Sequence, residues 1–281
     1  MVATPIGNLD DFSSRAVSVL KEVDLVVAED TRHSQPLLRH FGINTPMQAM
    51  HEYNERAAMT GILRRLLDNQ AVALISDAGT PLISDPGFPL VRECHRQGIR
   101  VSPVPGPSAV TCALSAAGLP TDRFLFEGFL PRTQAARCGR LRSLKLEQCT
   151  LVFYESSHRL CDSIRDMVAE LGAERQVLLA RELTKLHETL ISATLGGLLE
   201  QVEADPMQRK GEMVLLVAGA KDDRDAAQSA EAERVLEILL QELPVKQAAA
   251  LAARITGGKK NRLYQQALVM KSALDNRSRS S

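Results

Sequence analysis

The chain has 281 residues and no net charge, since 34 Lys and Arg balance 34 Asp and Glu. Apolar residues make up 44% of it, which is ample for a packed core and excludes disorder of the whole chain. With 4% aromatic residues and no Trp, a surface that stacks single-stranded bases on exposed rings is not expected. The five cysteines lack C-x-x-C spacing; with no apolar leader and no run of about 20 apolar residues, this predicts a cytoplasmic protein with reduced thiols.

Strand and helix patterns alternate along most of the chain. Short runs rich in Val, Ile and Leu predict buried strands at residues 25–28, 72–75, 99–104, 150–154, 177–180 and 213–217. Amphipathic helices ending before a glycine are expected at residues 37–41, 90–97 and 163–171. This alternation predicts an α/β fold with largely parallel strands. The first strand would be residues 1–3, which is short for a central strand, so this edge is either truncated or continues upstream.

Breaks in the pattern suggest the domain organisation. Gly118-Leu119-Pro120 interrupts the alternation, and residues 221–229 are polar and acidic. Beyond them the pattern is purely helical, with helices expected at residues 230–241, 245–255 and 259–274, and a tight turn at Gly257-Gly258. We therefore expect an α/β lobe at 1–118, a second at 119–220, a linker at 221–229 and a helix-turn-helix-like module at 230–281.

Charge is distributed unevenly within this neutral chain. Residues 128–146 contain five basic side chains and no acid, residues 221–243 contain seven acids and three bases, and residues 244–281 contain eight bases and one acid. A single basic run is usually a solvated helix face, but two such runs in a neutral protein favour contact with a polyanion.

Two long loops rich in Gly and Pro follow predicted strands of the first lobe. Residues 76–87 follow one strand, and residues 105–109 follow the next, with Ser108 placed to cap a helix. Ligands of open α/β sheets bind at the carboxyl ends of strands, and small residues let the backbone approach them closely. Ordinary strand-to-helix turns would explain either loop alone. G-x-G-x-x-G, Walker A and H-E-x-x-H patterns do not occur, which disfavours a common dinucleotide site, a P-loop and a metal centre.

Charged groups follow other strands. Glu29-Asp30-Thr31-Arg32 could supply a general base with a cationic partner, or simply acids at a helix N-terminus. In the second lobe, residues 154–159 and 181–185 carry further charges, which surface salt bridges would also explain.

Taken in order, eight motifs closely resemble the bacterial ribosomal RNA small subunit methyltransferase I family of the tetrapyrrole-methylase superfamily, over essentially the whole chain. They lie at residues 4–9, 28–33, 76–81, 105–109, 128–131, 153–160, 181–185 and 210–213. The resemblance implies a homodimer of two-lobed chains that bind S-adenosylmethionine between the lobes, and no metal.

The resemblance also implies roles for individual residues. The cofactor would be bound by Pro5, Asp77, Ala78, Gly79, Ile83, Ser108, Ala109, Tyr154, Glu155 and Met213. Glu29 matches an acidic proton acceptor of the superfamily, so Glu29, Asp30 and Arg32 are the predicted catalytic group. The reaction would be 2′-O-methylation of a cytidine in the decoding region of 16S ribosomal RNA.

The two basic runs are the expected RNA contacts, because phosphates bind to cationic side chains and to helix N-termini. Their members are Arg132, Arg137, Arg140, Arg142 and Lys145 in the first run and Lys259, Lys260 and Arg262 in the second. Two alternatives remain. A tetrapyrrole C-methyltransferase would have no use for basic runs, and a non-catalytic RNA- or ribosome-binding protein would not need the loops or the acidic group.

Overall fold

The computed structural model describes residues 1–51, 53–220, 223–258, 263–268 and 270–271. The chain divides into two compact units, Met1–Ala220 and Lys221–Ser281. Among the described residues, no helix is both long enough and apolar enough to cross a membrane.

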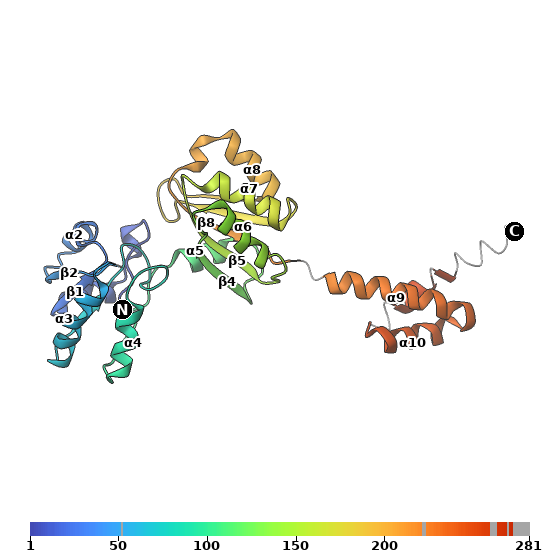
Figure 1. The fold of residues 1–281 in the computed structure, drawn as a ribbon, viewed down its shortest axis with the longest axis horizontal. Coiled ribbons are helices and arrows are strands. Elements are labelled where there is room, and N and C mark those ends of the chain that lie inside the picture. Colours follow the sequence, from blue (N-terminus) through green and yellow to red (C-terminus); the bar gives the residue numbers. More distant parts are fainter. Residues whose placement is uncertain (52, 221–222, 259–262, 269, 272–281) are drawn as a thin grey trace. The chain divides into compact units, whose positions relative to one another are not determined.

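The first unit contains a three-stranded sheet and a five-stranded sheet. Its helices and strands (Figure 1) are η1 (Leu9–Asp11), α1 (Ser14–Glu22), β1 (Leu25–Ala28), α2 (Thr31–His40), β2 (Met47–Ala49), α3 (Glu55–Leu67), β3 (Val72–Leu74), α4 (Phe88–Arg96), α5 (Ala109–Ala116), β4 (Phe124–Phe129), α6 (Gln134–Ser143), β5 (Thr150–Ser156), α7 (Leu160–Leu171), β6 (Gln176–Arg181), β7 (Thr189–Thr194), α8 (Leu195–Ala204), η2 (Pro206–Arg209) and β8 (Glu212–Val217).

The smaller sheet has the strand order β2-β1-β3, and both pairs are parallel. All four residues of the central strand β1 are buried, as expected for a parallel strand covered by helices on both faces. Because the strands are parallel, Glu29 after β1 and Ser76 and Asp77 after β3 emerge at the same edge. The sequence-predicted strand at 25–28 matches β1.

The strand predicted at residues 99–104 is wrong. Only Val104 pairs, in a single parallel bridge with Val2. Pro103 and Pro105 flank Val104, and proline has no N–H to donate to a sheet. Residues 1–4 do not form a regular strand either. Val2 N donates to Leu74 O, Val104 N donates to Met1 O, and Thr4 forms an antiparallel bridge with Gly79.

The larger sheet has the order β4-β5-β8-β6-β7. Only β4 and β5 run parallel, whereas the β5–β8, β8–β6 and β6–β7 pairs are antiparallel. The expectation of largely parallel strands therefore holds in the first lobe and is wrong in the second. Strands β2, β4 and β7 were not predicted, and none of them is fully buried.

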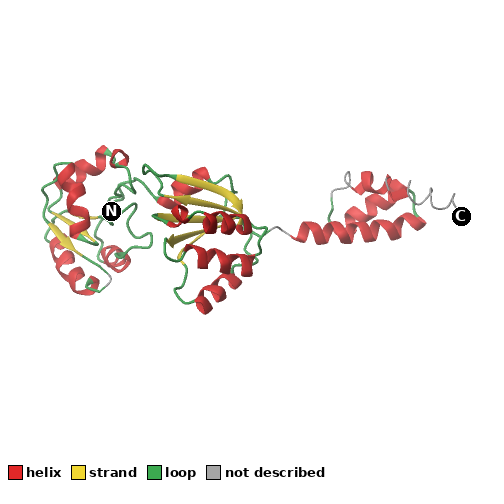
Figure 2. Ribbon diagram, turned by 90° about the horizontal axis from the view of Figure 1, so that it is seen from above, coloured by secondary structure: helices red, strands yellow, loops and turns green. Residues whose placement is uncertain are grey.

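Helices cover both faces of this larger sheet (Figure 2). On one face, α6, α7 and α8 bury side chains such as Leu141, Ile164 and Leu198 against Phe153 and Leu215. On the other face, Val110, Ala113 and Leu114 of α5 pack against Val152, Leu178 and Val214. Helix α5 thus packs on the second sheet although it precedes the boundary predicted at residue 118.

The second unit contains α9 (Asp223–Glu242), α10 (Val245–Thr256) and a further helical stretch at 263–268. Leu236, Leu240, Ala248, Ala252 and Leu263 form its core. Gly257, at φ 71°, ends α10, as expected for a left-handed C-cap glycine. Helix α9 begins inside the segment predicted to be a linker, because its Ala, Gln and Glu residues are good helix formers. Lys259, Lys260 and Arg262 lie outside the described residues.

Candidate active site

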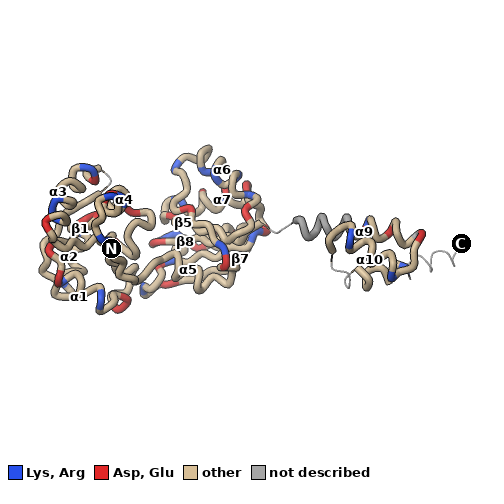
Figure 3. Tube along the Cα trace, turned by 90° about the horizontal axis from the view of Figure 1, so that it is seen from below, with Lys and Arg blue, Asp and Glu red and all other residues tan. Residues whose placement is uncertain are grey.

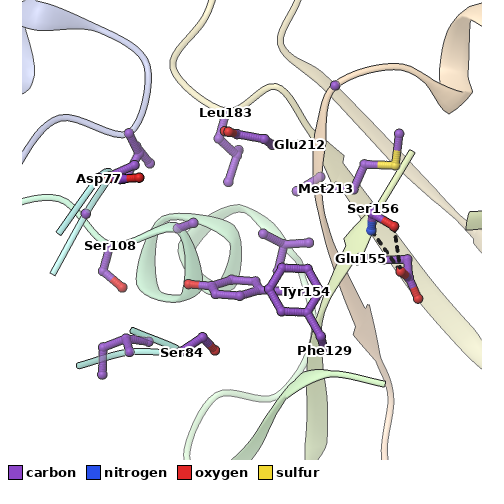
Figure 4. Close-up of a pocket in the computed structure, with 18 of the residues that line it drawn as sticks. Asp77, Ser84, Ser108, Phe129, Tyr154, Glu155, Ser156, Leu183, Glu212 and Met213 are labelled. Atoms are coloured by element: carbon purple, nitrogen blue, oxygen red, sulfur yellow. Dashed lines mark hydrogen bonds between the residues drawn. The ribbon is translucent and has the colours of Figure 1, made fainter. Parts of the chain in front are cut away.

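A cavity of about 390 Å³ lies between loops of the two lobes in the first unit. The first lobe contributes the loop after β3 and the start of α5. The second contributes residues from β4, β5, β6 and β8 and the turns that follow them. Figure 4 shows most of the lining residues. The full lining consists of Ile6, Asp77, Ala78, Gly79, Thr80, Ile83, Ser84, Asp85, Ser108, Ala109, Phe129, Tyr154, Glu155, Ser156, Ser157, Ala180, Leu183, Gly211, Glu212, Met213 and Val214.

Hydrogen bonds hold the first-lobe wall in place. The backbones of Thr4 and Gly79 exchange two of them, at 2.9 and 3.0 Å. The Thr80 hydroxyl donates to Pro107 O at 2.9 Å, which joins the two Gly- and Pro-rich loops. Gly79 has φ +83°, a conformation that residues with a side chain adopt only with strain. The glycine in this loop therefore permits the left-handed backbone, and the small side chains of the loop leave room in the cavity.

Residues with left-handed backbone flank the cavity on both sides. Leu82 and Ser84, at φ 73° and 70°, belong to the first-lobe loop, while Glu182 and Thr184, at 52° and 66°, follow β6. Each such residue costs about 1–3 kcal/mol, and such strain clusters at functional sites. The Glu55 carboxylate accepts a 2.7 Å hydrogen bond from Gly87 N–H and thereby fixes the end of the first-lobe loop.

The second-lobe wall combines an aromatic surface with an apolar floor. The Tyr154 ring contacts Phe126 and Phe129, with ring centroids 5.0 and 5.6 Å apart. Burial, with a smaller contribution from the charge of Asp85, raises the pKa of Tyr154 to about 12. Tyr154 is therefore a neutral hydrogen-bonding group at physiological pH. Leu183, Met213 and Val214 provide apolar surface.

Four carboxylates line the cavity, and their surroundings differ. Glu155 is buried and accepts hydrogen bonds from Ser156 N–H, at 2.8 Å, and from the Ser163 hydroxyl. In Figure 4 its carboxylate lies beside Ser156, on the opposite side of the view from Asp77 and Ser108. Glu212 pairs with Lys185 at 3.0 Å, and Asp77 Oδ1 accepts from Asp30 N–H at 3.1 Å. The sequence analysis did not single out the fourth, Asp85.

Asp85 has a raised pKa. Burial, followed by the negative charges of Glu29 and Asp77, raises its pKa to about 6, against a smaller opposing effect of a hydrogen bond from Ser76. The sequence signal was its position in the long loop 76–87. Its proximity to Glu29 arises from parallel strand pairing, which the sequence does not display. No group of three or more potential metal ligands occurs in the described part of the chain.

Comparisons with known proteins add to this geometry. Residues 1–199 match the family model described as Tetrapyrrole (Corrin/Porphyrin) Methylases, and residues 226–271 match one described as RsmI C-terminal HTH domain. A Pseudomonas aeruginosa protein named Ribosomal RNA small subunit methyltransferase I is 58% identical over 269 residues, covering 95% of each chain. A relative of the same name from Escherichia coli O157:H7 is 55% identical, covering 95% of this chain and 93% of its own.

The chain belongs to the ribosomal RNA small subunit methyltransferase I family.

Solved structures of tetrapyrrole methylases share the fold. Cobalt precorrin-4 methyltransferase has a TM-score of 0.58 and 19% identity over 77% of this chain and 92% of its own. Uroporphyrin-III C-methyl transferase from Thermus thermophilus, in a complex with S-adenyl homocysteine, has a TM-score of 0.53 and 18% identity over 76% and 94%. At these identities the likeness concerns the fold, and it agrees with the expected two-lobed α/β class with a helical C-terminal module.

The cavity of this methyltransferase I family member brings together nine of the ten residues predicted to bind the cofactor. They are Asp77, Ala78, Gly79, Ile83, Ser108, Ala109, Tyr154, Glu155 and Met213. Pro5 does not line the cavity; it is buried, and the adjacent Ile6 takes its place in the wall.

The three predicted catalytic residues lie outside the cavity lining. Asp30 is the N-cap of α2, accepting from Arg32 N–H, and its carboxylate also pairs with the Arg32 side chain at 3.0 Å. The hydrogen bonds from the Arg32 side chain and backbone lower the pKa of Asp30 to about 2. Burial and the charges of Asp77 and Asp30 raise the pKa of Glu29. Glu29 is thus the better proton acceptor of the two. It does not line the cavity itself, but its charge interacts with Asp77 and Asp85, which do.

The first basic run forms α6 and the residues around it, whose arginines Figure 3 marks in blue. Arg137 is buried and pairs with Asp166 at 2.6 Å, so its prediction as an exposed RNA contact is wrong. Arg140 pairs with Glu127 and Arg142 with Glu170, each at 2.7 Å. Arg132 and Lys145 are exposed, and no ion pair within the described residues includes them. Three of the five basic side chains in this run are therefore paired with acids, so fewer positive charges are available to RNA than the sequence suggests.

Proposed function

We propose that this methyltransferase I family member transfers a methyl group from S-adenosylmethionine to the ribose 2′-hydroxyl of a cytidine in the decoding region of 16S ribosomal RNA. The observation that carries the proposal is the 58% identity, over 95% of both chains, with a relative named for this ribosomal activity. The position of the methylated hydroxyl and the choice of nucleotide come from the family resemblance.

The residues of the cavity fit S-adenosylmethionine. Its volume of about 390 Å³ falls in the range of about 300–1,000 Å³ of small-molecule sites. Leu183, Met213 and Val214 offer an apolar surface suited to a flat base. The Gly79 turn lets backbone atoms approach a ligand, and the carboxylates of Asp77 and Asp85 suit the positive charge of a sulfonium.

Bound S-adenosylmethionine would supply an electrophilic methyl group. The contribution of the chain is to hold the ribose oxygen in line with it, a positioning effect that can supply about 7–11 kcal/mol. The two hydrogen-bonded loops of the first lobe and the packed aromatic wall of the second suit that task, since both have little freedom to move. A carboxylate near the hydroxyl would remove its proton.

RNA binding is proposed for two surfaces. One is the exposed part of the first basic run, where the side chains of Arg132 and Lys145 form no ion pair among the described residues. The other is the second unit, whose match to a helix-turn-helix model supports a nucleic-acid role. The RNA would be presented as part of the small ribosomal subunit.

A homodimer is also proposed. Leu186 and Leu190, on the turn before β7 and on this edge strand, are 94% and 43% exposed, and a second copy of the chain could cover them. Analytical ultracentrifugation should then give twice the 30.7 kDa chain mass, and a monomer at micromolar concentration would contradict the proposal.

The decisive experiment combines cofactor binding and methyl transfer. Ala78 is exposed and lines the cavity, so Ala78→Leu should fill space there without disturbing the core. We expect calorimetry to show S-adenosylmethionine binding in the wild type and its loss in this variant. Ala135→Leu, on an exposed position of α6, is the matched control and should bind normally.

Transfer is followed with radiolabelled cofactor and small ribosomal subunits. Label in 16S ribosomal RNA, retained on a 2′-O-methylated cytidine after nuclease digestion, is the expected result. Labelling of a tetrapyrrole instead would favour the small-molecule C-methyltransferase. Subunit binding without cofactor binding would favour a non-catalytic ribosome-binding protein.

A further inference from the structure

Three of the four carboxylates that line the cavity are already committed to structural partners. Asp77 holds the backbone N–H of Asp30. Glu155 is enclosed by the hydroxyls and N–H of Ser156 and Ser163, and Glu212 pairs with Lys185. A carboxylate that accepts donors is a weaker base, because each donor stabilises its charged form. If one of these three took up a proton, its existing hydrogen bond or ion pair would be weakened.

Asp85 has different neighbours. The negative charges of Glu29, after β1, and Asp77, after β3, raise its pKa against an opposing effect of Ser76, and its own charge raises the pKa of Tyr154 on β5. No ion pair in the described part of the chain involves Asp85. Half-buried and repelled by two other acids, its carboxylate is a stronger base than an ordinary aspartate.

The backbone holds Asp85 in position against this repulsion. It follows Ser84, which has a left-handed backbone, and precedes Gly87, whose N–H is held by Glu55. A Cβ on Gly87 would lie 2.7 Å from Leu82 and 2.8 Å from Leu74, so the end of the loop packs tightly against the first lobe. The loop therefore cannot easily turn Asp85 away from the cavity.

We propose that Asp85 is the general base that accepts the proton of the substrate hydroxyl, with Glu29 as a positioning residue that acts through it. This inference rests on the proposed function. In the transfer, the O–H bond breaks and its proton passes to Asp85 Oδ. The oxygen forms a bond to the methyl carbon while the carbon–sulfur bond breaks, leaving its electron pair on sulfur and converting the positive sulfonium to a neutral thioether.

The alternatives among the predicted catalytic residues fit less well. Asp30 is held by the Arg32 side chain and backbone and caps α2, so protonating it would cost both interactions. Glu29 shares the electrostatic environment but does not line the cavity. Asp85 and Asp77 both line the cavity without an ion pair among the described residues, but Asp77 already accepts the backbone N–H of Asp30.

The first test is Asp85→Asn, which keeps the shape of the side chain. At saturating subunit and cofactor, the single-turnover rate constant should fall by about 10²–10⁴-fold, while the Kd for S-adenosylhomocysteine stays within a few-fold of wild type. Asp122→Asn, an exposed residue outside the cavity lining, is the control and should keep the wild-type rate. A wild-type rate in Asp85→Asn would overturn the assignment.

The second test uses pH and separates Asp85 from Glu29. The base must be deprotonated, so the wild-type rate should fall as pH drops through about 6, the pKa of Asp85. Glu29→Gln removes a neighbouring negative charge and should move this limb to lower pH. If Glu29 is the base instead, Glu29→Gln abolishes transfer at every pH and Asp85→Asn only shifts the limb.

A readout independent of turnover completes the test. In protein with ¹³C-labelled aspartate carboxyls, one resonance should titrate near pH 6, disappear in Asp85→Asn and titrate at lower pH in Glu29→Gln. Absence of such a resonance contradicts the proposal. If wild-type protein does not methylate small-subunit RNA, the proposed function fails; if it does while Asp85→Asn is equally active, only the role of Asp85 fails.

Discussion

Three acids near the first-lobe side of the cavity differ in their neighbours from acids of the second lobe. In the second lobe, carboxylates meet donors: Asp166 pairs with Arg137, Glu155 with Ser163, and Glu182 with Lys185. In the first lobe, the negative charge of Asp77 raises the pKa of both Glu29 and Asp85. The second-lobe acids are therefore stabilised by donors, whereas these first-lobe acids repel one another.

Glu29 and Glu182 make the contrast clear. Burial acts to raise the pKa of both. In Glu182, hydrogen bonds from Glu212 N–H and Lys185 outweigh burial and lower the pKa. In Glu29 the neighbouring acids add to burial and raise it. The partners of a carboxylate, more than its depth, decide whether it can serve as a base near neutral pH.

The largest effect is expected from breaking the most buried pair of the second lobe. Asp166→Ala leaves the Arg137 guanidinium, whose side chain is 6% exposed, without its anion, so the free energy of unfolding should fall by about 3–5 kcal/mol. Urea unfolding followed by circular dichroism measures this loss. Asp162→Ala breaks the exposed pair with Arg165 and should change stability little; equal losses in the two variants would contradict the contrast.

A smaller loss is expected at Glu155. Glu155→Gln replaces a buried acceptor by an amide that cannot satisfy both Ser156 N–H and the Ser163 hydroxyl. The free energy of unfolding should fall by about 1–3 kcal/mol, the usual cost of an unsatisfied buried polar group. Ser157→Ala, next to it on the cavity wall, is the control. Unchanged stability in Glu155→Gln would show that its hydrogen bonds are dispensable.

In the first lobe, removing a carboxylate should raise the free energy of unfolding. The pKa of Asp85 is raised from 3.8 to about 6, so the folded state holds this proton more tightly than the unfolded state. Its contribution to stability is present below pH 3.8 and is lost as pH rises through about 6. The Asn side chain of Asp85→Asn does not ionise and so avoids this cost. The variant should therefore be more stable than wild type at pH 8. A less stable variant at pH 8 would mean that Asp85 has an attractive partner.

The smallest effect concerns RNA affinity. Paired arginines should add little to phosphate binding, whereas each exposed cation that contacts a phosphate adds about 0.7–0.9 to the slope of log affinity against log salt. Arg132→Ala with Lys145→Ala should therefore lower the slope for small-subunit RNA. Arg142→Ala with Glu170→Ala, which removes a neutral pair, should leave it unchanged, and equal slopes for all three proteins would remove α6 from the RNA surface.

The sequence predicted what depends on local patterns. β1 follows from its apolar run, α7 and α10 follow from apolar periodicity with a glycine or proline at their ends, and the cavity loops follow from Gly79, Ser108 and their neighbours. Arrangements that depend on distant partners were not predicted. The edge strand β7 has a weak alternation, Arg137 looked exposed because Asp166 is 29 residues away, and the proximity of Asp85 to Glu29 requires the parallel pairing of β1 and β3.

The left-handed residues at the cavity also bear on heat tolerance. Leu82, Ser84, Glu182 and Thr184 hold conformations that glycine would adopt without strain. Substitutions chosen for melting temperature alone would therefore favour these four sites. Ser84→Gly would relax the backbone next to Asp85 and let the loop sample other arrangements. A thermostable variant that keeps transferring methyl groups should draw its gains from the helical surfaces and leave these four residues in place.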